Sequence, residues 1–144
     1  MKRVLFDLAT LVTRVTVGVI FIAHGWQKYQ HGIDVTTRLM AKAGVPFPRL
    51  SGLFATWVEL IGGIMLVAGL LVPVAGVLLA LDMLGAIVFV TGKHGLFATE
   101  NGWELPAALG VASLLLAATG GGQYALDRVV ARRSSQEMAD AQIR

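Results

Sequence analysis

Long apolar stretches separated by short polar segments dominate the chain. Crossing a hydrocarbon core of ~30 Å takes about 20 mostly apolar helical residues. The stretches of that kind run over about residues 8–29, 51–72, 74–91 and 103–119. The pattern predicts an all-α fold: an integral membrane bundle of four helices within residues 1–124, followed by a polar tail at residues 125–144.

Proline and glycine mark the expected ends of these spans. Pro73 cannot donate a backbone hydrogen bond, so we expect the second span to end there and to form an antiparallel hairpin with the third. The run Gly120-Gly121-Gly122 ends the fourth span. Asn101 and Glu104 have the spacing of a capping box, but Pro106 favours a helix that begins nearer Trp103.

The first loop, residues 30–50, contains a short helix candidate. Asp34 can cap its start, and Gly44 can stop it before Pro46 and Pro48. Apolar and charged side chains recur on different faces of this segment. The loop therefore predicts a short amphipathic helix that lies along the membrane surface.

Composition excludes several classes of protein. Of the 144 residues, 56% are hydrophobic and 15% are charged, and the mean hydropathy is +0.70. Cysteine is absent, which excludes disulfides, thiol chemistry and iron–sulfur ligation by this chain. The net charge of +3 comes from the two ends and the first loop, which is typical of membrane flanks and predicts no nucleic-acid partner.

An even number of spans puts both termini on one side of the bilayer. Lys2, Arg3 and Arg128 lie close to their spans, so we expect the termini in the cytoplasm and the protein in the cytoplasmic (inner) membrane. Asp7 and Arg14 interrupt the first apolar stretch, which favours an uncleaved first helix over a signal peptide.

Ionisable residues at membrane depth are the candidates for function. Counting ~1.5 Å per residue from each outer span end places them together in the outer half of the bundle. A charge at the centre of a helix costs about 2.5 to 3.5 kcal/mol on insertion scales, so these groups should face inward and find partners. The candidate cluster consists of His24, Lys28, Glu59, Asp82 and Glu104.

Helical spacing makes Glu59 the expected centre of this cluster. It shares a face with Gly52, Gly62 and Gly63, where another helix can approach closely, and we expect it to contact His24 or Lys28. Arg14 lies far from the cluster. We expect it to extend toward the cytoplasmic surface.

Two interpretations of the cluster remain open. It can be a buried network that only fixes helix packing, or a binding or proton-handling site. We expect no metal, because His24, His31 and His94 lie on separate elements without ligand spacing.

Four motifs in order along the chain resemble the DoxX family of membrane proteins. They are His24-Gly25-Trp26-Gln27-Lys28, Trp57-Val58-Glu59-Leu60-Ile61-Gly62-Gly63, Gly102-Trp103-Glu104 and Gly122-Gln123-Tyr124-Ala125-Leu126-Asp127. The resemblance covers about residues 8–127. It implies an accessory subunit of a membrane redox or oxidative-stress system, with a soluble redox enzyme as partner and a quinone near the polar cluster.

Other functions stay open beside this one. The sequence shows no nucleotide motif, no haem-ligand pair and no nucleophile with its base, so we expect no catalysis by this chain alone. The alternatives are a small proton- or cation-coupled permease or channel, in which a homo-oligomer would complete the path, and a purely structural assembly protein.

Overall fold

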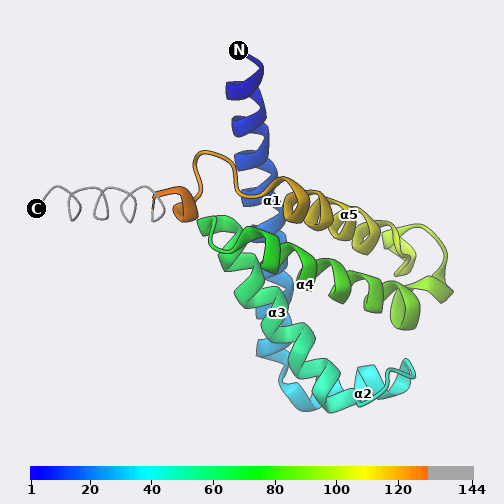
Figure 1. Ribbon diagram of the computed structural model, residues 1–144. Helices are drawn as coiled ribbons and strands as arrows, with labels where there is room; N and C mark the ends of the chain where they lie inside the picture. Colours follow the sequence, from blue (N-terminus) through cyan, green and yellow to red (C-terminus); the bar gives the residue numbers. More distant parts are fainter. Residues whose placement is uncertain (130–144) are drawn as a thin grey trace, which may run out of the picture.

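The computed structural model of the chain describes residues 1–129, and every regular element in this part is helical (Figure 1). Helices α1 (Lys2–His31) and α3 (Pro48–Ala68) are long and apolar enough to cross a membrane. So is the run Val72–His94, which comprises α4 (Val72–Gly85), η1 (Ala86–Thr91) and η2 (Gly92–His94). The fourth expected span, α5 (Glu104–Thr119), is apolar but has only 16 residues.

The shorter elements fill the loops on one side. Helix α2 (Ile33–Lys42) lies in the first loop, where the short helix was expected, and its Thr36 packs against Gly52 of α3. A short turn, η3 (Ala98–Glu100), precedes α5. Of the expected polar tail, residues 130–144 lie outside the described residues.

The turn between α3 and α4 differs from the expected one. Helix α3 ends at Ala68 because Gly69 adopts a left-handed conformation with φ 76°, which caps the helix before Pro73 is reached. Pro73 instead lies in the first turn of α4, where its missing N–H costs nothing. The proline therefore begins the third apolar helix rather than ending the second.

Glycines set the contact between α1 and α3. A Cβ atom added to Gly18 would lie 2.7 Å from the carbonyl oxygen of Gly63, and one added to Gly63 would lie 2.7 Å from the oxygen of Gly18. No side chain fits at that distance, so the two backbones touch directly. A similar contact joins α4 and α5, where a Cβ at Gly76 would lie 2.6 Å from the oxygen of Ser113.

The molecule thus consists of two helix pairs, α1 with α3 and α4 with α5. From the turn at Gly69, α3 and α4 diverge, so the pairs are close at one end and apart at the other (Figure 1). Buried apolar side chains fill the region where they are close. This core comprises Val17, Phe21, Leu66, Val72, Ala75, Leu79, Met83, Leu109 and Leu116.

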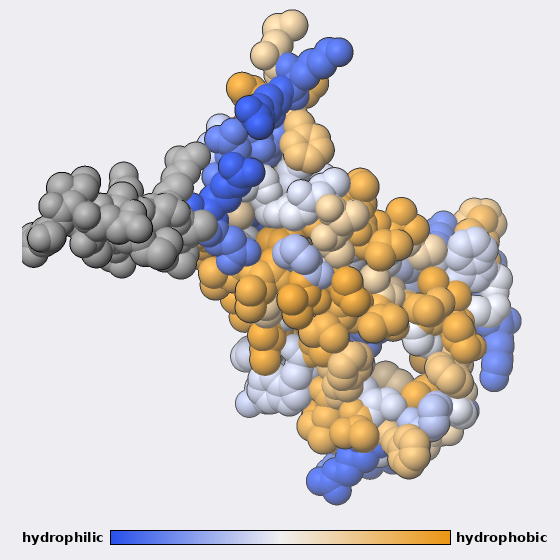
Figure 2. Space-filling view, in the orientation of Figure 1, coloured by the Kyte–Doolittle hydropathy of each residue, from blue (hydrophilic) through white to orange (hydrophobic). Residues whose placement is uncertain are grey.

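Large apolar side chains also cover the outside of the helices (Figure 2). Val19 of α1, Ile64 of α3 and Leu81 of α4 are each more than half exposed. In a water-soluble protein such a continuous apolar surface would drive association. Here it is the surface that a bilayer solvates.

Candidate ligand site between the helix pairs

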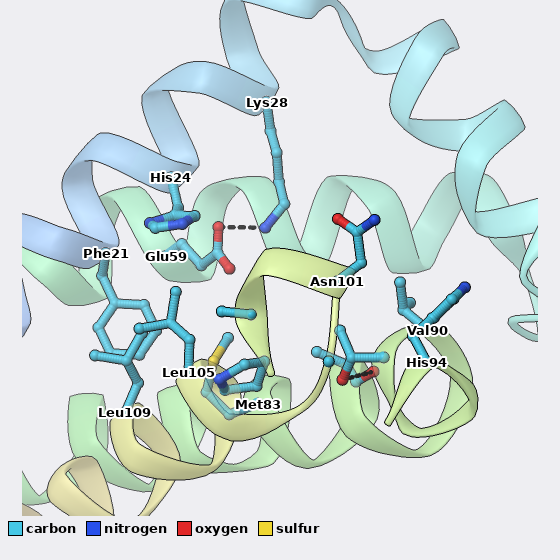
Figure 3. Close-up of a pocket in the computed structure, with 15 residues that line it drawn as sticks. Phe21, His24, Lys28, Glu59, Met83, Val90, His94, Asn101, Leu105 and Leu109 are labelled. Atoms are coloured by element: carbon cyan, nitrogen blue, oxygen red, sulfur yellow. Dashed lines mark hydrogen bonds and ion pairs between the residues drawn. The ribbon is translucent and has the colours of Figure 1, made fainter. Parts of the chain in front are cut away.

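An ion pair joins the two helices of the first pair near the end where the pairs diverge. Nζ of Lys28 on α1 donates to Oε2 of Glu59 on α3 (Figure 3). The side chain of Glu59 is 3% exposed and that of Lys28 is 29% exposed. The predicted contact between Glu59 and the first helix is therefore present, with Lys28 as its partner.

His24 lies one helical turn before Lys28 on α1. Its Nδ1 is 2.9 Å from the carbonyl oxygen of Ile20. When Nδ1 donates to this carbonyl, Nε2 of a neutral ring is left as an acceptor. In Figure 3 the His24 ring, Glu59 and Lys28 lie on the same side of one cavity.

This cavity, which we call the loop-side cavity, has a volume of about 430 Å³. Its wall opposite the ion pair comes from η1, from the loop before α5 and from the start of α5. Such a volume is within the range of small-molecule sites, which are mostly apolar with a few placed polar groups. The polar lining residues are His24, Lys28, Glu59, Thr91, His94 and Asn101.

A second cavity, the α2-side cavity, has a volume of about 610 Å³. It lies between the end of α2, the start of α3 and the end of α4, and apolar side chains make most of its wall. Asp82 of α4 lines this cavity, close enough to Glu59 and Lys28 for their charges to act on it. Figure 2 shows an opening in the surface that is bordered largely by hydrophobic side chains.

The ion pair lies where the two cavities meet. Lys28 and Glu59 line both cavities, as do Ala86 and Val90 of η1. Helix η1 is a π-helix, whose wider turn re-aims side chains, and such segments occur frequently at functional sites. The structure thus places four of the five predicted residues, His24, Lys28, Glu59 and Asp82, around adjoining spaces.

Glu104 is the exception. Its Oε1 accepts a hydrogen bond from the backbone N–H of Ala98 at 2.7 Å, and its side chain lines neither cavity. The carboxylate stabilises the turn of η3 rather than the ion pair. Depth counting placed Glu104 near the cluster, but it could not show that the preceding loop folds back onto this side chain.

A separate polar cluster lies at the other end of the bundle, and it corrects the prediction for Arg14. The side chain does not extend to the surface: Arg14 is 2% exposed. Its Nη1 donates to the carbonyl of Gly121 at 3.1 Å and its Nη2 to that of Tyr124 at 3.2 Å. Arg14 therefore holds the segment after α5 against α1.

Asp7 supports the same segment from one face of α1. It is 8% exposed, and its Oδ1 accepts a hydrogen bond from the backbone N–H of Gln123 at 3.1 Å. Sequence reasoning missed this cluster. The available signal was the seven-residue spacing of Asp7 and Arg14, which puts both on one helical face.

Among residues 1–129, no three histidine, aspartate or glutamate side chains gather closely enough to hold a metal ion. The polar groups around the loop-side cavity are two imidazoles, an ammonium, a carboxylate, a hydroxyl and an amide. Such a set can donate and accept hydrogen bonds with a neutral polar ring while apolar walls enclose the rest of the ligand.

The apolar exterior, the long apolar helices and the buried ion pair define a small helical membrane protein with a polar site inside its membrane domain. The chain belongs to the DoxX family, whose sequence pattern matches residues 9–92. The predicted family is therefore confirmed.

Curated relatives agree with this family. The chain is 35% identical over 125 residues to "Putative oxidoreductase CatD" of Bacillus subtilis, covering 87% of this chain and 89% of that protein. It is 29% identical to "Uncharacterized membrane protein Rv3486" of Mycobacterium tuberculosis, covering 88% of this chain and 84% of that one. No solved structure gives a significant match.

Proposed function

We propose that this DoxX-family protein is an accessory subunit of a membrane redox or oxidative-stress system and that it binds a quinone beside the Lys28–Glu59 ion pair. The observation that carries the proposal is the place of this pair, between two cavities rather than inside a closed core. The cavities leave room for a polar ligand to form hydrogen bonds with the pair, and a pair that only fixed helix packing would not need that room.

The chemistry of the loop-side cavity suits a quinone ring. The Lys28 ammonium can donate to a carbonyl oxygen, and the His24 imidazole can exchange a proton with a quinol hydroxyl. Phe21, Met83 and Leu109 provide apolar wall around these groups. The similarity to a relative named as an oxidoreductase supports a redox role, and a soluble redox enzyme would supply the catalytic groups that this chain lacks.

We further propose four membrane spans in the inner membrane, with cytoplasmic termini. Helix α5 rises only about 24 Å over its length. A span of this length is accommodated when the bilayer thins locally or flanking residues reach its surface. Helix α2 then lies along the outer surface and the Arg14 cluster lies near the cytoplasm.

Single cysteines test this orientation, since the chain has none of its own. Thr99→Cys and Gln123→Cys lie in exposed loops at opposite ends of the bundle and change no charge. In intact cells a membrane-impermeant thiol reagent should label position 99, whereas position 123 should react only after permeabilisation. The reverse pattern would show that the termini are outside.

Transport is the rival function, and the packing of the monomer argues against it. A proton or cation path would have to pass from the Lys28–Glu59 pair to the Arg14 cluster. Between them lies the apolar core, in which Leu66, Val72 and Leu79 are completely buried. Proton flux into liposomes that contain the purified protein would reverse this conclusion.

Ligand binding tests the proposal directly. Protein purified in mild detergent should release a quinone into organic solvent, identified by mass spectrometry. Added quinone should quench the native tryptophan fluorescence in a saturable manner. Glu59→Gln and Lys28→Met should both weaken this binding about tenfold or more, because each removes a charged hydrogen-bonding group from the site.

The matched control is Glu100→Gln, which removes the same charge from an exposed side chain that lines neither cavity. It should bind quinone as the wild type does. The proposed function would be overturned if no quinone copurified and added quinone did not bind. Equal quinone binding by Glu59→Gln and Glu100→Gln would also overturn it.

A further inference from the structure

Resting on the proposed function, we infer that a single ligand occupies both cavities, with a compact polar ring in the loop-side cavity and a flexible apolar tail in the α2-side cavity that points toward the bilayer. The two spaces differ in chemistry but adjoin at the Lys28–Glu59 pair. The ligand class is therefore an amphiphile with one tail, as in a prenylated or alkylated quinone.

The loop-side cavity fits the ring because its polar side chains come from opposite walls. His24 and Lys28 lie on α1, whereas His94 ends η2 and Asn101 lies in the loop before α5 (Figure 3). Groups on both sides can hold the two carbonyls of one ring at once. His94 and Asn101 are exposed, so this end of the site faces the aqueous side.

The α2-side cavity fits the tail because apolar side chains make most of its wall and exposed apolar side chains form part of its rim. Leu50, Phe54 and Leu81 line it while remaining 67%, 43% and 55% exposed. We place these exposed apolar side chains on the surface that the bilayer covers. A tail can therefore pass from the hydrocarbon into the cavity without crossing water.

Between the two cavities, η1 contributes small side chains to the shared wall. Ala86 and Val90 line both spaces, and a Cβ added to Gly85 would meet no atom within 4 Å. Gly85 has helical backbone angles, with φ −59°. A larger side chain at this position would fill the α2-side cavity without straining the backbone.

Gly85 therefore offers a test that separates tail from ring. The probes are a tailless benzoquinone and the same ring with a decyl tail, titrated in one detergent against the wild type and against Gly85→Phe. In the wild type, the tailed probe should bind at least about tenfold more tightly, because burying a few methylene groups is sufficient for that factor. Gly85→Phe should abolish this difference and leave tailless binding unchanged.

Two control variants isolate the effect of cavity filling. Gly85→Ala changes helix propensity at the same position and adds little volume, so it should retain the tail dependence. Val88→Phe adds the same ring to η1 at a position that is 57% exposed and lines neither cavity. It should also retain the tail dependence, which removes partition into the detergent as an explanation.

The outcomes distinguish the inference from the proposed function. Tailless binding with a tail effect that Gly85→Phe does not change would overturn the inference and leave the proposed function intact. Binding of the tailed probe alone, insensitive to Glu59→Gln, would place the ring elsewhere and overturn the inference. Failure of both probes to bind would overturn both.

Discussion

Two clusters of buried charge lie at opposite ends of the same bundle, and their partners differ. Arg14 donates to backbone carbonyls of the segment after α5, and Asp7 accepts from a backbone N–H of that segment. Lys28 and Glu59 instead pair side chain to side chain and border two cavities. Backbone groups cannot turn away when a ligand arrives, whereas side chains can exchange one partner for another.

This comparison indicates a division of roles. The Arg14 cluster holds three parts of the chain together, because Asp127 also donates its backbone N–H to the carbonyl of Gly69 at 3.2 Å. The hydrogen bonds of the Arg14 cluster therefore stabilise the fold. The Lys28–Glu59 pair has a partly exposed lysine side chain, and Asp82 nearby is a second carboxyl group. Its interactions can be redistributed, which a binding site requires.

Removing Arg14 should have the largest effect on stability. Arg14→Met removes the donors to the carbonyls of Gly121 and Tyr124, and each hydrogen bond to a charged group contributes about 1.5 to 3 kcal/mol, so we expect a loss of about 3 to 6 kcal/mol. The thermal midpoint in detergent should fall sharply, while folded protein at low temperature should still bind quinone. Arg3→Met, at an exposed position, is the control. Equal midpoints for the two variants would contradict the structural role.

Breaking the Lys28–Glu59 ion pair should reduce stability less than Arg14→Met does, and it should reduce quinone binding more. In Glu59→Gln the Lys28 ammonium can turn toward solvent or Asp82, so we expect a loss of about 1 to 3 kcal/mol. The double variant with Lys28→Met should recover part of it, because no unpaired charge remains. A double variant as unstable as the sum of the single ones would show that the two side chains do not interact.

Changing Glu104 should have the smallest effect. Its carboxylate accepts one backbone hydrogen bond in a loop, so Glu104→Gln should cost less than about 1 kcal/mol. Quinone affinity should stay at the wild-type value. A loss of quinone affinity as large as that of Glu59→Gln would show that Glu104 belongs to the ligand site.

The sequence predicted one cluster and missed the other for a physical reason. Glu59 and Lys28 carry charges at calculable depth on straight helices, so counting residues was enough to bring them together. Arg14 donates to the backbone carbonyls of Gly121 and Tyr124. Because every residue has a backbone carbonyl, the sequence does not indicate which ones lie next to α1 in the folded chain. The end of α3 before Gly69 was also not predicted, because Pro73 is the stronger helix-stop signal in the sequence.

The turn at Gly69 has a mechanical consequence. It is clamped, because a Cβ at Gly69 would collide with the Arg14 guanidinium and with Ala125. From this pivot, the 14 residues of α4 form a lever about 21 Å long. A tilt of about 3° at the pivot would move the far end of α4 by about 1 Å, roughly the scale on which helices shift in switching proteins. The residues that hold the turn at Gly69 therefore set the width of the cavities at the other end of the bundle.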